Sequence, residues 1–159
     1  MSGNISPGVE YVCGFAFDAV DHPFNRVLLI HKKRPDFQAG LLNGIGGKIK
    51  PGESAAQAMI REFEQETGMM LENWIYFCKL RVIDEWTVHF FFTQANINAA
   101  ATKTDEEIEA CYVTSILNRW DMMPDLRWLV PMALRMKEEP CHYLEVIRIG
   151  ADVNKAVCT

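Results

Sequence analysis

The stretch that decides the fold is GGKIKPGESAAQAMIREFEQETGM, residues 46–69. Its glycine-rich beginning predicts a loop, with a short strand inside it as the alternative. Ser54 and Gln57 then form the S-x-x-Q pattern of a capping box, and Gly68 stands where a helix stop is preferred. We therefore predict a helix over residues 54–67. Its apolar stripe is expected to consist of Ala56, Met59, Ile60 and Phe63.

Carboxylates crowd one flank of this predicted helix. At about 100° per residue, Glu62 and Glu66 stack on one face, Gln65 lies beside them, and Glu64 points well away. Clustered carboxylates repel one another unless a positive charge lies between them, and hard oxygen ligands suit Mg²⁺ or Mn²⁺. Together with Glu53 just ahead of the helix, they are candidate ligands of a divalent metal. An acidic helix taken alone is more often a solvated face, and the glycine-rich loop and the spacing are what strengthen the case for a metal site.

The neighbouring loop favours phosphate chemistry. A metal so placed can bridge phosphate oxygens and activate water, Lys48 or Arg61 can add positive charge, and glycines let the backbone approach a phosphate closely. The reaction class that this suggests is hydrolysis of a phosphoanhydride.

Length and composition indicate one domain over residues 1–159, with a core over about 9–150 and a loose tail at 151–159. The net charge of −5 argues against a nucleic-acid partner, and neither a membrane-length apolar run nor a signal peptide is apparent. Five scattered cysteines without a C-x-x-C pair predict reduced thiols. We expect a cytoplasmic protein with no membrane association, either a monomer or a homodimer.

Strand patterns and a second helical pattern surround the acidic helix, so the expected fold class is α+β, a mixed β-sheet between helices. The second helix is expected over residues 126–139, bent or begun at Pro131. The predicted strands cover residues 11–17, 26–32, 74–83, 86–94, 109–116 and 143–149.

The stretch resembles the Nudix signature, G-x5-E-x7-R-E-U-x-E-E-x-G-U, in which U is a bulky aliphatic residue. The departure is Gln65, which stands where the family has the first glutamate of its E-E pair. The resemblance implies a single Nudix-type α/β/α sandwich. The residues in register are Gly47, Glu53, Arg61, Glu62, Phe63, Glu66, Gly68 and Met69.

The Nudix resemblance also implies roles for individual residues. Glu62 and Glu66 would bind metal, Gln65 would be a ligand position of altered chemistry, and Arg61 and Glu53 would form an ion pair that braces loop against helix. The carbonyl of Gly46 would join the metal shell. A further ligand from a distant loop would be Glu107, with Glu106 as the close alternative.

The chain is also similar to MutT-homologue enzymes that hydrolyse oxidised purine nucleoside triphosphates such as 8-oxo-dGTP. The segments HKKRPDFQAG, NGIGGK, VHFFF and DMMPDLRWLVPMAL carry this likeness. It implies that Asn43 and Asp125 bind the base edge and that Phe37 packs on the base. Two positions depart from the pattern: Met123 replaces a stacking Trp, and Leu126 replaces a second acid.

The leading hypothesis is a Mg²⁺-dependent enzyme, with Mn²⁺ as a possible substitute, that cleaves a (deoxy)nucleoside triphosphate into monophosphate and pyrophosphate. One alternative keeps the chemistry but takes a linked nucleoside diphosphate, such as ADP-ribose, a dinucleoside polyphosphate or an RNA cap. Another is a nucleotide-binding module without turnover, because Gln65 lacks the charge of a glutamate.

Overall fold

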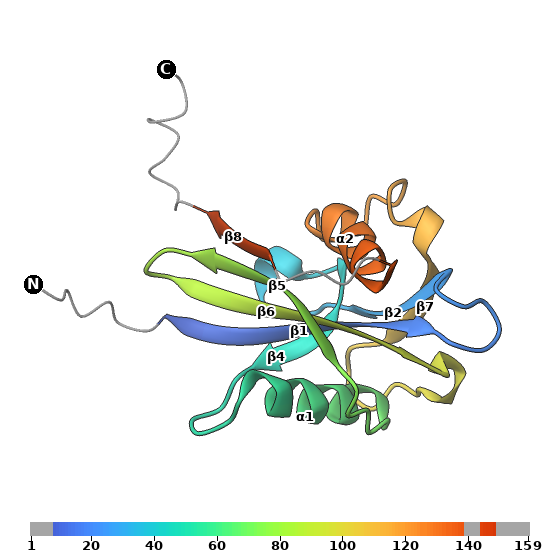
Figure 1. Cartoon of the computed structure of the whole chain (residues 1–159), viewed down its shortest axis with the longest axis horizontal. Helices are drawn as coiled ribbons and strands as arrows, with labels where there is room; N and C mark the ends of the chain where they lie inside the picture. The colour runs from blue at the N-terminus through green and yellow to red at the C-terminus, as the bar shows by residue number, and fades with distance from the viewer. Residues whose placement is uncertain (1–7, 139–143, 149–159) are drawn as a thin grey trace, which may run out of the picture.

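A computed structural model describes residues 8–138 and 144–148. Eight strands form one mixed sheet with the order β3-β2-β1-β6-β5-β8, while β4 pairs with β1 and β7 pairs with β2 (Figure 1). The strands are β1 (Val9–Asp18), β2 (Arg26–His31), β3 (Leu42–Asn43), β4 (Ile45–Lys48), β5 (Ile75–Val82), β6 (Trp86–Ala95), β7 (Ile108–Tyr112) and β8 (Leu144–Arg148).

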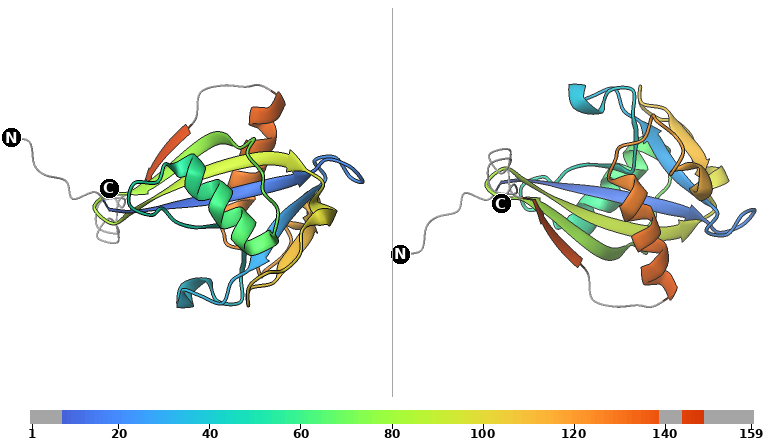
Figure 2. Two further views of the ribbon diagram at one scale, coloured as in Figure 1. Left: turned by 90° about the horizontal axis from the view of Figure 1, so that it is seen from below. Right: turned by 90° about the horizontal axis from the view of Figure 1, so that it is seen from above.

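Two helices cover opposite faces of the sheet. Helix α1 (Ala55–Thr67) lies on one face and α2 (Leu126–Glu138) on the other, as Figures 1 and 2 show. Each face has its own apolar core: Met59 and Phe63 of α1 pack on one side, and Leu129 and Val130 of α2 pack on the other. The three layers confirm the α/β/α sandwich and the mixed sheet expected from the sequence.

Helix α1 begins and ends where its sequence predicts. The Ser54 hydroxyl accepts the N–H of Gln57 and the Gln57 side chain accepts the N–H of Ser54, so the capping box is complete. Gly68 has a φ of 75°, a left-handed conformation that costs glycine little. One predicted stripe position is wrong: Ala56 is exposed, and Ala58 is fully buried in its place.

Two other predicted elements differ from the structure. The strand expected over residues 109–116 ends at Tyr112, because the backbone turns into the 3-10 helix Val113–Ser115. Helix α2 begins at Leu126, so a start at Pro131 is wrong. The N–H missing at Pro131 would have bonded to the carbonyl of Arg127, which lies in the exposed first turn where water can replace it.

Some of the residues for which the sequence gives expectations lie outside the part of the chain that the structure describes. Cys13, Cys78 and Cys111 are free and buried, as expected of reduced thiols, whereas Cys141 and Cys158 lie outside the described residues. The tail at 151–159 and the outer residues of the last predicted strand, 143 and 149, also lie outside them. In the described part of the chain, neither helix is long and apolar enough to cross a membrane.

The corrected apolar stripe of α1 predicts effects of different size for two alanines near the start of the helix. Ala58→Leu should lower the free energy of unfolding by about 1–3 kcal/mol, because the extra methyl groups must enter a filled core. Ala56→Leu, the matched control at an exposed position, should change it by less than about 0.5 kcal/mol. Urea unfolding measures both values. Equal effects of the two substitutions would contradict the burial described here.

Candidate functional site

Arg61 joins the glycine-rich loop to helix α1. Its Nε and Nη2 donate to the two carboxylate oxygens of Glu53 at 2.7 and 2.8 Å, and Nη2 also donates to the carbonyl of Lys48 at 3.1 Å. Its Nη1 donates to Glu62 at 2.6 Å. The hydrogen bonds from Arg61 lower the pKa of Glu53 to about 2, and those bonds in turn raise the pKa of Arg61. The ion pair expected between loop and helix is therefore present.

Gly46 and Gly47, in strand β4 at the start of the glycine-rich segment, let this segment lie close to helix α1. A Cβ on Gly47 would lie 2.5 Å from the carboxylate carbon of Glu62, so Glu62 occupies the space that a side chain would fill. A Cβ on Gly46 would lie 1.9 Å from the carbonyl oxygen of Val12, because β4 pairs directly with β1. The Val12 backbone thus leaves no room for a larger residue at position 46, and a larger residue at position 47 would displace the Glu62 carboxylate.

Glu66 is held by a loop far away in the sequence. The hydroxyl of Thr104 donates to Glu66 Oε2 at 2.7 Å, and the backbone N–H of Lys103 donates to the Glu66 carbonyl at 3.2 Å. The sequence patterns did not indicate Thr104, because nothing local connects residue 104 with α1. This contact brings the loop that carries Glu106 and Glu107 against the acidic face.

The structure separates the two candidate ligands of that loop. Glu106 is 4% exposed and accepts hydrogen bonds from Lys32 Nζ at 2.8 Å and the Lys33 N–H at 2.5 Å. Burial raises its pKa, but these hydrogen bonds outweigh burial and the pKa is lowered overall. Glu107 is exposed to solvent. Of the two, Glu107 is therefore the one whose carboxylate is not occupied by hydrogen bonds from Lys32 and Lys33 and is open to solvent.

The donors beside the loop fit a hard divalent cation. Glu62 and Glu66 provide carboxylates, Gly46 provides a carbonyl, and the amide of Gln65 is exposed next to them, with its oxygen 3.4 Å from Arg61 Nη1. Within residues 8–138 and 144–148, no three His, Cys, Asp or Glu side chains gather as a metal site by themselves. Glu107 is thus not brought together with the other two carboxylates, and a cation here would need carbonyl, amide, water or substrate ligands as well.

The residues expected to read a base lie at another part of the sheet. The carbonyl oxygen of the Asn43 side chain accepts the N–H of Gly44 at 2.8 Å, and its NH₂ group donates to Gln38 at 3.0 Å. Next to Asn43, Leu42 pairs with the segment before α2: the Met123 N–H donates to the Leu42 carbonyl at 2.9 Å. Asn43 and Met123 therefore lie on adjacent segments, as a shared pocket requires.

Asp125 is the next polar group along that segment. Its Oδ1 accepts hydrogen bonds from Trp128 Nε1 at 3.1 Å and from Arg148 of β8. Phe37 is 71% exposed in the 3-10 turn Asp36–Gln38, so it is not part of the protein core and its ring is open to a ligand. Met123 is half-buried against the larger core, and the Lys48 side chain is exposed.

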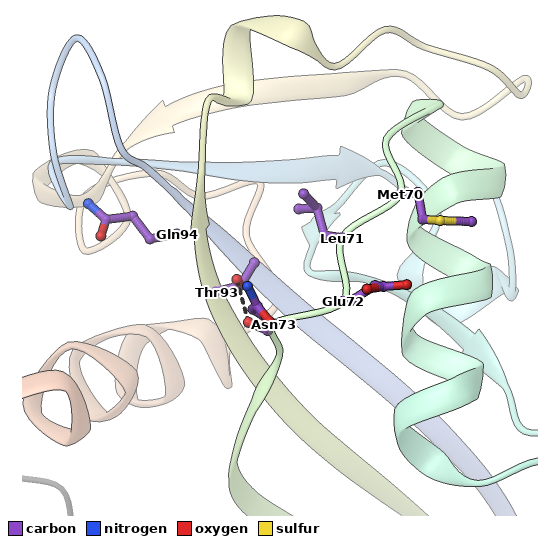
Figure 3. A pocket seen from close by; sticks show the side chains of 6 residues that line it. All are labelled: Met70, Leu71, Glu72, Asn73, Thr93 and Gln94. Carbon is purple, nitrogen blue, oxygen red and sulfur yellow. Dashed lines mark hydrogen bonds between the residues drawn. The ribbon is translucent and has the colours of Figure 1, made fainter.

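A surface hollow of about 440 Å³ lies elsewhere. Figure 3 shows it between the segment after α1 and the end of β6, with Glu72 and Asn73 on one side and Thr93 and Gln94 on the other. The sequence-predicted site residues do not line it. Within this lining, the Thr93 hydroxyl donates to the Asn73 carbonyl at 2.7 Å, so these two polar groups are already paired.

Comparison with known proteins agrees with this geometry. The family profile of the NUDIX domain matches residues 12–131. The chain belongs to the Nudix hydrolase family. The oxidized purine nucleoside triphosphate hydrolase of Mus musculus is 28% identical to this Nudix hydrolase over 123 residues, which cover 74% of this chain and 78% of the mouse protein.

Solved structures support the Nudix fold. A MutT Nudix hydrolase of Burkholderia pseudomallei superimposes with a TM-score of 0.65 at 21% identity, covering 80% of this chain and 98% of that one. The Nudix domain of Shewanella oneidensis NrtR, solved with ADP ribose, gives a TM-score of 0.69 at 16% identity and covers 83% and 90% of the two chains. Nudix hydrolases generally use divalent metal ions, in keeping with the oxygen donors beside the glycine loop.

The Arg61–Glu53 pair predicts a defined pH dependence of stability. The folded-state pKa of Glu53, about 2, lies below its ordinary value of 4.5. Its contribution to stability is therefore fully present above pH 4.5 and is lost as the pH falls toward 2. Urea unfolding of the wild type and of Glu53→Gln should differ most near neutral pH, and the difference should shrink below pH 4.5. Glu72→Gln, at an exposed position, is the control, and a pH-independent difference for Glu53→Gln would contradict the prediction.

Proposed function

We propose that this Nudix hydrolase cleaves a (deoxy)nucleoside triphosphate into the monophosphate and pyrophosphate, with Mg²⁺ as its cofactor. The observation that carries the proposal is the carboxylate of Glu62 seated directly on Gly47 and held there by Arg61. This arrangement puts an acidic helix face against a loop that a phosphate can approach closely.

Each residue of the acidic face has a proposed task. Glu62, Glu66 and the Gly46 carbonyl would hold the cation, and Mn²⁺ could replace Mg²⁺. Glu107, which is not gathered with these carboxylates, would contribute through a bound water or the substrate. A cation bound there neutralises charge on the phosphate oxygens and lowers the pKa of a bound water. Arg61 and Glu53 keep loop and helix at a fixed separation, and the exposed Lys48 ammonium attracts the phosphates.

Gln65 should change how tightly the cation is held. Its carbonyl oxygen is a neutral ligand, whereas the Nudix pattern has a charged glutamate there. We propose that the enzyme remains active but requires a higher metal concentration.

The base end supports a purine nucleotide. Asn43 and Asp125 supply hydrogen-bonding groups on adjacent segments, Phe37 offers an exposed ring, and Met123 gives a softer contact than an aromatic residue. The similar mouse protein is named for oxidised purine nucleoside triphosphates, so an oxidised or otherwise modified purine nucleotide is the substrate that we favour.

The first test is a nucleotide panel with Mg²⁺ and Mn²⁺, containing normal and oxidised dNTPs, NTPs, ADP-ribose and dinucleoside polyphosphates. We expect monophosphate and pyrophosphate from a triphosphate. Glu66→Gln should lower kcat by at least about 10²-fold, whereas the matched control Glu64→Gln, on the exposed side of α1, should leave it nearly unchanged. Cleavage only of linked diphosphates would overturn the substrate assignment. Stabilisation by nucleotides without turnover would instead make the chain a binding module.

A second test concerns Gln65, the neutral residue among the expected metal ligands. Gln65→Glu should lower the Mg²⁺ concentration that gives half-maximal rate, because it adds a charged oxygen ligand next to Glu62 and Glu66. The matched control is Gln57→Glu, which places the same charge in the first turn of α1. Isothermal titration with Mn²⁺ measures affinity independently of turnover. An unchanged or higher metal requirement for Gln65→Glu would contradict the role proposed for this position.

A further inference from the structure

Arg148 contacts the residue proposed to read the base. Its Nη2 donates a hydrogen bond to Asp125 Oδ1. The same oxygen accepts a hydrogen bond from the indole N–H of Trp128, at an N···O distance of 3.1 Å. The carboxylate is therefore fixed in orientation by two donors on one oxygen, and neither of these donors uses Oδ2. The side chain of Asp125 is 20% exposed and that of Arg148 is 49% exposed, so a ligand can reach both groups.

The register of β8 explains how a residue so late in the chain reaches this place. Val146 pairs with Leu80 and packs on the core beneath α2. Arg148 is two residues further along the strand and pairs with Val82, so it lies on the same face of the sheet as Val146. That face is the one that α2 covers, and Asp125 lies directly before α2.

Asn43 presents a donor at the same end of the site. A backbone N–H can only donate, so the hydrogen bond from Gly44 identifies the acceptor of the Asn43 amide as its oxygen. The NH₂ group consequently points toward Gln38 and uses one hydrogen there, which leaves the second for a ligand. The polar groups available to a base at the proposed site are thus a carboxylate that can accept, a guanidinium that can donate and an amide that can donate.

We propose that Arg148 is a specificity-determining residue that makes the site select 6-oxo purines over 6-amino purines, an inference that rests on the proposed function. A 6-oxo purine carries an N1–H donor beside its O6 acceptor, which complements Asp125 and the unused donors of Arg148. A 6-amino purine reverses this pattern: its N1 lone pair meets the carboxylate and its amine meets the guanidinium. Each mismatch leaves polar groups unpaired at the half-buried end of the site.

The test compares kcat/KM for two pairs of substrates, dGTP with dATP and 8-oxo-dGTP with 8-oxo-dATP. We expect the wild type to prefer the 6-oxo member of each pair. Arg148→Met should lower that preference about tenfold, mainly by slowing the 6-oxo substrate, and Arg148→Lys should restore part of it because the charge remains. dITP should keep much of the preference, since it retains O6 and N1–H.

Two controls separate this role from a general effect on folding. Arg81→Met removes the same charge from β5, at a residue that pairs with Ile147 and is 43% exposed, and it should leave the preference unchanged. In an Asp125→Asn background, Arg148→Met should have little further effect on the preference, because the two residues act as one unit. Thermal unfolding shows that each variant is folded at the assay temperature.

The outcomes distinguish the two proposals. A wild type that hydrolyses triphosphates, together with an Arg148→Met variant that keeps the full preference, would overturn the inference and leave the proposed function standing. Equal loss of preference in Arg81→Met would also overturn it. A chain that cleaves no nucleoside triphosphate with either metal would overturn the proposed function and, with it, the inference.

Discussion

The site depends on one guanidinium. Arg61 contacts Glu53, Glu62 and the Lys48 carbonyl, so a single side chain sets the distance between the glycine loop and the acidic face of α1. Without it, two carboxylates would face each other across a loop with no charge to balance them. The same close approach requires glycine at positions 46 and 47, because a Cβ at either position would collide with Val12 or Glu62 atoms.

The two ends of the proposed substrate site are built differently. The phosphate end comes from one continuous stretch, where loop, helix cap and carboxylates follow one another within residues 46–69. The base end is assembled from four separate places, namely the 3-10 turn that carries Phe37, β3, the segment before α2, and β8. One loop connects the phosphate end and the base end. Its Thr104 donates a hydrogen bond to Glu66 at the phosphate end. Its Glu106 accepts hydrogen bonds from Lys32 and the N–H of Lys33, just ahead of the turn that carries Phe37.

This difference explains what the sequence could and could not predict. Short-range rules identify the capping box of α1 and its glycine stop, because these depend on fixed spacings in a helix and its cap. The Arg61–Glu53 pair is expected from the Nudix resemblance alone, and the structure contains it. The predicted stripe contains Ala56 in place of the buried Ala58, two positions later, because both residues are small and apolar and the pattern alone does not separate them. Arg148 and Thr104 were missed since strand register and loop packing decide their partners across 23 and 38 residues, and no periodic pattern records such contacts.

The central claim is that a divalent cation binds between the glycine loop and the acidic face of α1. Paramagnetic broadening by Mn²⁺ in an amide nitrogen–proton NMR spectrum tests it without requiring turnover. The account predicts that at substoichiometric Mn²⁺ the amide signals of residues 46–48 and 62–66 broaden first, and that Glu62→Gln and Glu66→Gln each weaken the effect. Broadening centred instead on residues 70–73, or no localised broadening at all, would contradict it.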